Sequence, residues 1–275
     1  MKNEARPPEI IGIWRLGEGL HRGTHCSSYL CQPADSPGSP RFDYVLKLPN
    51  AVDADSHSAF RRFVTVAGRA RHPNLIAVLD SGTVLASESA QGVEEIPFLV
   101  MPRLGGTDLM EMLSDGRPFP LPVVLWLARQ AAAALAQLHS AGFVHGNLRP
   151  ECLRVQTDGH VTVMDLTHAC PVGQPIAGDT ASIRNAPEMQ KEIAAAQASA
   201  DIYSLGCVMW QLLSGLCEPS SDARSAMAGQ EAMELITQTL QEEPRHRPTA
   251  EQLVQRLLKM EINNLQSTIV PARAA

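Results

Sequence analysis

Four residues of this chain are of types that could bind a phosphate group and a metal ion. Gly17 and Gly19, in Leu16-Gly17-Glu18-Gly19, would permit a turn whose backbone amides approach a phosphate. Lys47 follows two apolar residues and carries a cation that can pair with a phosphate, and Asp165 carries a carboxylate that can bind Mg²⁺. Each signal is weak alone, so its meaning depends on the elements that position these residues.

The pattern of apolar and turn-forming residues predicts two regions. Up to residue 103 it indicates a helix from about Asp55 to Ala70, with Asp55 or Ser56 as its N-cap, and several short strands. The strands are expected at Ile10–Leu16, Ser28–Gln32, Phe42–Leu48, Leu75–Leu79 and Pro97–Met101.

Beyond residue 104 the periodicity is helical. Helices are expected at Pro122–Ser140, Ala200–Ser214, Ala226–Leu240 and Thr249–Glu261, the last capped by Thr249. Residues 263–275 show no pattern, and we expect a flexible tail there. We therefore expect two domains, at 9–103 and 104–262.

The amino-acid composition argues against several classes of protein function. The 275 residues are 44% hydrophobic, enough for two fused lobes, and the net charge of −6 argues against a nucleic-acid-binding surface. No apolar stretch approaches the length of a membrane span, so we expect no membrane insertion. The six cysteines lack paired spacing, so we expect reduced thiols and a cytoplasmic protein.

The order of motifs resembles that of the eukaryotic-type Ser/Thr protein kinases. About a dozen landmarks occur in the family's order between residues 10 and 260, which is very improbable by chance. They include Leu16-Gly17-Glu18-Gly19, Val45-Leu46-Lys47, His72-Pro73-Asn74, Leu138 to His145, His145 to Cys152, Asp165-Leu166-Thr167, Ala186-Pro187-Glu188, Asp201 to Gly206 and Arg247-Pro248. The resemblance implies an α+β, bilobal kinase-like fold, in which a small antiparallel β-sheet lobe with helix αC precedes a larger helical lobe.

Compared with active kinases, the chain lacks groups that phosphoryl transfer needs. Asn147 stands where the resemblance places the catalytic aspartate, and a neutral amide cannot accept the substrate proton. Cys152 replaces the metal-binding asparagine, and a thiol is a poor ligand for hard Mg²⁺. Phe63 falls where helix αC normally carries the glutamate that pairs with Lys47, and positions 59–68 contain no acid. We expect Phe63 to be buried.

The nucleotide-binding side is also altered. Arg22 occupies the third glycine position, and the segment between Gly19 and Tyr29 is longer than usual. Val45 replaces an alanine above the base, and Arg154 replaces an apolar residue beneath it, unless its strand register points it outward. Lys47 and Asp165 could pair with each other across the cleft without any ligand.

The other residues that differ from those of active kinases, and the residues that match them, support the same interpretation. Gly146 replaces the arginine that would bind an activation-loop phosphate, and Thr180–Arg184 replaces the usual peptide-docking motif. The residues that are structural in kinases are retained, and Glu188 and Arg247 are expected to form a buried ion pair. These structural residues are His145, Glu188, Asp201, Gly206 and Arg247.

The resemblance leaves three functions open. The first is a pseudokinase, inactive or severely impaired, that serves as a binding, regulatory or scaffold module for a protein partner such as an active kinase. The second is a nucleotide sensor that binds ATP without turnover, and the third is an atypical Ser/Thr kinase with slow transfer. No catalytic residue is intact, and any weak binding of ATP with magnesium would use Lys47, Asp165, Gly17 and Gly19, with Asp165 as the metal ligand. No cofactor is expected to be required.

Overall fold

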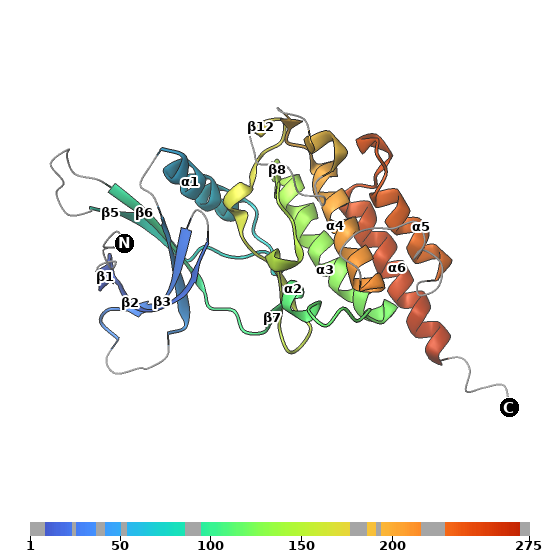
Figure 1. Ribbon diagram of the computed structural model, residues 1–275, viewed down its shortest axis with the longest axis horizontal. Helices are drawn as coiled ribbons and strands as arrows, with labels where there is room; N and C mark the ends of the chain where they lie inside the picture. Colours follow the sequence, from blue (N-terminus) through green and yellow to red (C-terminus); the bar gives the residue numbers. More distant parts are fainter. Residues whose placement is uncertain are drawn as a thin grey trace. The chain divides into compact units, whose positions relative to one another are not determined.

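The chain forms two compact units, Met1–Gly68 with Ala77–Leu104 and Arg69–Ile76 with Gly105–Ala275. The short segment Arg69–Ile76 thus belongs to the second unit, although the sequence analysis placed it in a domain spanning 9–103. The computed structural model describes residues 9–23, 26–36, 42–50, 54–85, 95–176, 186–190, 194–215 and 229–269 (Figure 1).

The first unit contains a six-stranded antiparallel sheet and one long helix, as expected. The strand order is β1-β2-β3-β4-β6-β5. The strands are β1 (Ile10–Ile11), β2 (Trp14–Arg22), β3 (Cys26–Pro33), β4 (Tyr44–Pro49), β5 (Asp80–Leu85) and β6 (Glu95–Pro102), and the helix is α1 (Ala54–Arg69).

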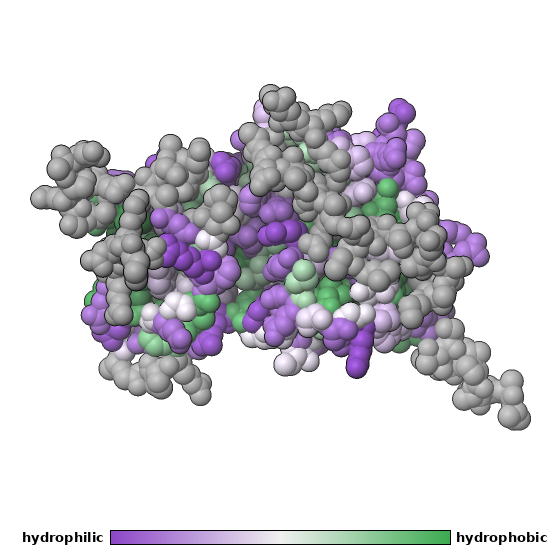
Figure 2. Space-filling model, viewed as in Figure 1, coloured by the Kyte–Doolittle hydropathy of each residue, from purple (hydrophilic) through white to green (hydrophobic). Residues whose placement is uncertain are grey.

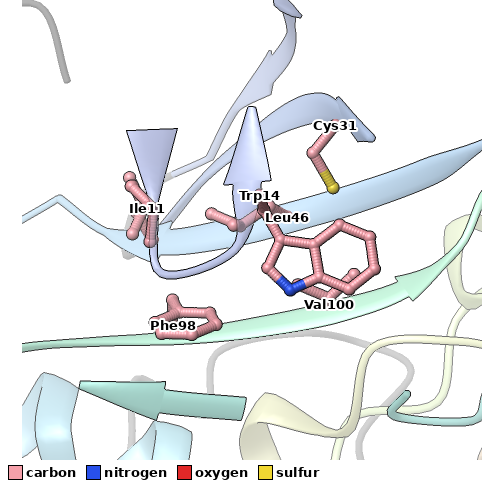
Figure 3. Packing of buried hydrophobic residues seen from close by; sticks show 7 residues of the cluster. Ile11, Trp14, Cys31, Leu46, Phe98 and Val100 are labelled. Carbon is pink, nitrogen blue, oxygen red and sulfur yellow. The ribbon is translucent and has the colours of Figure 1, made fainter. Parts of the chain in front are cut away.

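The core of this sheet is built from alternate residues of its strands, because successive side chains of a strand point to opposite faces. Ile11, Trp14, Cys31, Leu46 and Val100 pack into one buried cluster, together with Leu48 and Phe98 (Figure 3). The Trp14 indole donates a hydrogen bond of 2.6 Å to Asp80 on β5, so its one polar atom is satisfied.

The second unit is mainly helical. Its long helices are α3 (Leu121–Ser140), α4 (Ala198–Ser214), α5 (Gln230–Thr239) and α6 (Ala250–Ile269), and α2 (Leu109–Met112) is a single turn. Short strands join them: β7 (Thr107–Asp108), β8 (Phe143–Val144), β9 (Leu153–Val155), β10 (Val161–Val163), β11 (Cys170–Pro171), β12 (Pro175–Ile176) and β13 (Ala194–Ala195). Four short 3₁₀ helices, η1 to η4, span Pro150–Cys152, Leu166–His168, Pro187–Gln190 and Pro244–His246.

Helix α3 corrects one expectation. Its 20 residues are long and apolar enough to cross a membrane, although no such stretch was recognised in the sequence. Most of its apolar side chains, including Leu125, Ala131, Leu135 and Leu138, are fully buried in the core of the second unit. Packing in this core accounts for its apolar composition.

The exposed surface carries few large apolar side chains. In the view of Figure 2, the described surface is mostly hydrophilic, with small hydrophobic areas. Leu85 and Ile13 are the most exposed of the large apolar residues described, at 70% and 66%. Isolated residues of this kind are common on folded proteins.

Other boundaries also differ from the prediction. The strand expected at Ile10–Leu16 is divided into β1 and β2, and β2 continues to Arg22. Leu75–Leu79 is not a strand: Leu75 forms an isolated bridge to Val163, and the strand β5 begins only at Asp80. Backbone bonds join Asn74 and Ile76 to Val163 on β10 of the same unit, whereas the Leu79 amide bonds to the Val100 carbonyl on β6 of the first unit.

Helix α6 continues to Ile269, eight residues beyond the predicted end, into the expected tail. Ile262 and Leu265 continue the helical spacing of apolar residues, and no proline lies between Thr249 and Pro271. The predicted cap is confirmed, because Thr249 Oγ1 accepts from the Gln252 amide at 3.3 Å while Gln252 Oε1 accepts from the Thr249 amide at 3.0 Å.

Candidate functional site

The predicted site residues fall in both units, and each unit carries a distinct group of them. Lys47, Phe63, Gly17 and Gly19 lie in the first unit. The segment from His145 to Cys152 and Asp165 lie in the second.

Lys47 lies on β4 with its ammonium facing an aromatic ring. Leu46 and Leu48 point into the core of the sheet, so Lys47 points to the opposite face and is half-buried. Its Nζ is 5.7 Å from the centre of the Phe63 ring. Phe63 itself is only 2% exposed, which confirms that it is a core residue. Helix α1 thus offers the lysine a cation–π contact where active kinases offer a carboxylate.

The two glycines lie in a strand. Neither Gly17 nor Gly19 has a positive φ, and β2 shows irregular register on both sides of Gly19 before it pairs Arg22 with Ser27. A Cβ at Gly17 would come within 2.7 Å of the Phe42 ring. Packing against Phe42 therefore explains Gly17 without a phosphate. The Gly23 amide bonds to the Cys26 carbonyl at 2.9 Å, and residues 24 and 25 lie outside the described residues.

Val45 and Arg154 were predicted to border the adenine. Val45 shares a strand face with Lys47 and is half-buried. Arg154 points to the opposite side of β9 from the buried Leu153 and Val155, and its Nε donates to the Gly105 carbonyl at 3.1 Å. Its guanidinium is therefore positioned by the backbone of its own unit.

Asp201 positions the loop that starts at His145. Its carboxylate accepts from the amides of His145 and Gly146 at 2.7 and 2.9 Å, and it lies 2.8 Å from His139 Nε2. Burial alone would raise the pKa of Asp201, but the hydrogen bond and charge of His139, with His145, outweigh burial and lower this pKa. His145 Nε2 lies 3.0 Å from the Met164 carbonyl, which joins this loop to the segment before Asp165.

The backbone conformation at residue 146 explains why a glycine occupies this position. Its φ is +76°, a conformation that side-chain-bearing residues rarely adopt, and an added Cβ would lie 3.0 Å from the His168 carbonyl oxygen. The loss of the arginine therefore coincides with a backbone that favours glycine.

Cys152 is a buried, neutral thiol. It is 2% exposed, and its Sγ donates to the Asn147 carbonyl at 3.5 Å. Burial, and to a lesser degree Asp165, raises the pKa of the Cys152 thiol to about 11. At neutral pH the thiol keeps its proton, so it is neither a nucleophile nor an effective ligand for a hard cation. Asn147 follows His145, whose Nδ1 accepts from the Asn147 amide at 3.4 Å.

Asp165 adopts a left-handed backbone conformation, with φ 57° and ψ 69°. It is the only non-glycine residue with positive φ in the described part of the chain. Such a conformation costs on the order of 1–3 kcal/mol and persists where the surroundings impose it. Thr167 Oγ1 donates to Asp165 Oδ1 at 2.6 Å, so one carboxylate oxygen already has a partner. This role of Thr167 was not predicted from the sequence.

Glu188 and Arg247 form the predicted buried ion pair. Arg247 Nη1 and Nη2 contact the two Glu188 oxygens at 2.6 and 2.8 Å, and the Arg247 side chain is fully buried. Its other N–H groups donate to the carbonyls of Gln241, Ser199 and Glu242. The predicted changes at Thr180–Arg184 lie outside the described residues.

These positions fit magnesium-bound ATP poorly. No cluster of three or more potential metal-binding side chains occurs in the described ranges. Asp165 supplies one carboxylate, partly engaged by Thr167, and Cys152 supplies a protonated sulfur. The chemistry of this donor set does not match the oxygen ligands that magnesium prefers.

Comparison with known proteins identifies relatives. A family profile described as "Protein kinase domain" matches residues 43–258. A probable serine/threonine-protein kinase of Corynebacterium efficiens is 29% identical over 206 residues, covering 73% of this chain and 29% of that protein. Serine/threonine-protein kinase PknB of Mycobacterium leprae is 26% identical over 214 residues, covering 76% and 33% respectively. A probable serine/threonine-protein kinase of Streptomyces coelicolor is 28% identical over 244 residues, covering 86% and 34%. The matches thus span about a third of these relatives.

Proposed function

This chain belongs to the protein kinase family, and we propose that it is a pseudokinase, a catalytically inactive or severely impaired domain that acts as a binding, regulatory or scaffold module. It shares the kinase fold, with an antiparallel β-sheet followed by a helical region. The proposal concerns the chemistry that this fold can still perform.

The observation that carries the proposal is the state of Cys152 and Asn147. The two residues stand where active kinases carry a metal-binding amide oxygen and the catalytic aspartate. Here the first is a buried thiol with a pKa raised to about 11, and it is hydrogen-bonded to the backbone of the second. A neutral amide and a protonated thiol supply neither a base nor a hard ligand.

Phe63 supports the same conclusion from the first unit. A 2% exposed aromatic ring faces Lys47 from helix α1, at the position where active kinases carry the glutamate. We therefore propose that no cofactor is required and that ATP with magnesium binds weakly. The chain would act in the cytoplasm through a protein partner, for which an active kinase is one candidate, without binding nucleic acid or inserting into a membrane.

A phosphoryl-transfer assay tests the proposal. Purified chain with labelled ATP and magnesium should show neither autophosphorylation nor transfer to a generic substrate such as casein. Turnover that Lys47→Ala or Asp165→Ala abolishes would overturn the proposal and favour an atypical kinase. Loss in these variants is needed because it excludes a contaminating enzyme.

A second candidate is a nucleotide sensor without turnover. It is favoured by Asp165, which has a left-handed backbone conformation and accepts a hydrogen bond from Thr167, and by the retention of Lys47. A ligand at 100 times its dissociation constant stabilises a protein by about 2.7 kcal/mol, which a melting curve detects. We expect no clear shift with millimolar ATP and magnesium. A shift of several degrees that Lys47→Ala removes would favour the sensor.

A further inference from the structure

From Ser58 to its end at Arg69, helix α1 contains three arginines and no acidic residue. Between residues 56 and 79 the sequence contains no aspartate or glutamate, although the whole chain has a net charge of −6. Arg61, Thr65 and Gly68 are exposed and Arg62 is half-buried, at the spacing of one helix face. We call these four residues the basic stripe; Arg69 follows as the last residue of α1.

The opposite face fixes the orientation of the stripe. Phe60, Phe63, Val66 and Ala67 are between 1% and 7% exposed. Burying these four side chains contributes several kcal/mol, since each apolar side chain contributes roughly 1.5–3 kcal/mol when buried, alanine less. Arg61 is therefore exposed to the solvent and Arg62 is partly exposed.

The arginines of the stripe are not neutralised. No ion pair among the described residues involves Arg61 or Arg62. Arg62 Nη1 donates only to a neutral hydroxyl, Ser58 Oγ, at 2.7 Å. By contrast, Arg129 in α3 contacts Glu261 at 2.8 Å. Two adjacent uncompensated cations attract anionic groups.

Gly68 is a second, independent observation. Gly68 is the penultimate residue of α1, and a glycine in a helix costs up to about 1 kcal/mol relative to alanine. A Cβ at Gly68 would meet no atom within 4 Å, so packing within the described structure does not require glycine there. An exposed helix position without a side chain allows the backbone of another molecule to approach closely.

We propose that the basic stripe binds an acidic, Asp/Glu-rich segment of a partner protein. The arginine side chains suit carboxylates, which they can bind through two parallel hydrogen bonds. Gly68 provides room for the segment's backbone beside them. The proposal rests on the proposed function, because a domain without chemistry acts through what it binds, and it names the chemistry of that partner.

Peptide binding tests the proposal. The probe is a short fluorescein-labelled Glu-rich peptide, followed by fluorescence anisotropy with the full chain at low and high salt. Arg61→Glu combined with Arg62→Glu should weaken binding by at least about tenfold. The matched control is Arg245→Glu combined with Lys259→Glu, which changes the net charge equally at exposed positions of the second unit and should weaken binding less than about threefold. Equal losses in the two variants, or no binding by the wild-type chain, would overturn the proposal.

Gly68→Ala separates binding from folding. It should raise the melting temperature, because alanine favours the helix, and weaken peptide binding several-fold, because the added methyl group blocks the close approach. Unchanged peptide affinity would overturn the proposed surface. Tighter binding of a single-stranded oligonucleotide or a phosphoserine peptide than of the Glu-rich peptide would also overturn it. Phosphoryl transfer by the wild-type chain would instead defeat the proposed function, and the two failures are therefore distinguishable.

Discussion

Two groups of residues in the second unit differ in their hydrogen bonding. One group anchors the loop and the structure around it, and the other occupies the positions that carry out chemistry in active kinases. Asp201 holds the amides of His145 and Gly146, and Arg247 uses all its N–H groups on Glu188 and three carbonyls. A few residues away, the Cys152 thiol donates a weak hydrogen bond to the Asn147 carbonyl at 3.5 Å. The scaffold that positions the loop is thus extensively bonded beside positions that differ from those of active kinases, as the proposed role in binding would require.

Removing the guanidinium of Arg247 should have the largest effect on stability. Arg247→Ala leaves Glu188 partly buried without its partner, and breaking a buried pair costs about 3–5 kcal/mol. Chemical denaturation measures the loss, and Arg245→Ala serves as the control because its side chain is 79% exposed. A loss under about 0.5 kcal/mol for Arg247→Ala would place the residue among ordinary surface positions.

Phe63→Glu should be nearly as damaging. The substitution places a carboxylate in a site that is 2% exposed, and the nearby Lys47 offsets only part of the desolvation. We expect a loss of about 2–4 kcal/mol in denaturant unfolding. A neutral or stabilising result would mean that the site can accept the salt bridge of active kinases, and the contrast between scaffold and chemistry would weaken.

Asp201→Asn should give a smaller loss that depends on pH. The folded pKa of Asp201 is lowered, so its ionised form contributes stability above the unfolded value of about 3.9, and this contribution disappears as the pH falls through the folded pKa. We expect wild type and variant to differ by about 1–3 kcal/mol at neutral pH and to converge in acid. Unfolding curves between neutral pH and strong acid measure this, and a constant difference would contradict it.

Restoring one reactive group should have the smallest effect. Asn147→Asp introduces the catalytic carboxylate, but Cys152 remains a protonated sulfur and Phe63 remains opposite Lys47. We expect no detectable turnover of labelled ATP in this variant. Activity from the single change would show that Cys152 and Phe63 are tolerated, and that the chain lies one substitution from a working enzyme.

The sequence predicted the arrangement of the fold because its motifs occur in family order and its helices have clear periodicity. It also predicted the buried Phe63 and the Glu188–Arg247 pair. It predicted a strand at Leu75–Leu79, since a short apolar run has no signal that distinguishes a strand from an extended segment that forms only an isolated bridge, here between Leu75 and Val163.

Within the site, the sequence showed which positions differ from active kinases. It did not show the packing or backbone conformation that accounts for the residue at each position. Gly17 was assigned to phosphate binding, whereas its approach to Phe42 depends on a residue 25 positions away. The left-handed conformation of Gly146 likewise cannot be seen in a motif, because a missing arginine and a required glycine look identical in sequence.

The small segment Arg69–Ile76 has a practical consequence for dissecting the molecule into fragments. Asn74 donates to the Val161 carbonyl at 2.7 Å and to Gln130 at 3.1 Å, and the Val163 amide bonds back to the Asn74 carbonyl at 2.8 Å. The chain therefore crosses between its units three times, after residues 68, 76 and 104. A fragment that starts at residue 105 would remove these partners from the carbonyl of Val161 and the amide of Val163, so a stable helical unit expressed alone should require residues 69–76, supplied by a linker or by circular permutation.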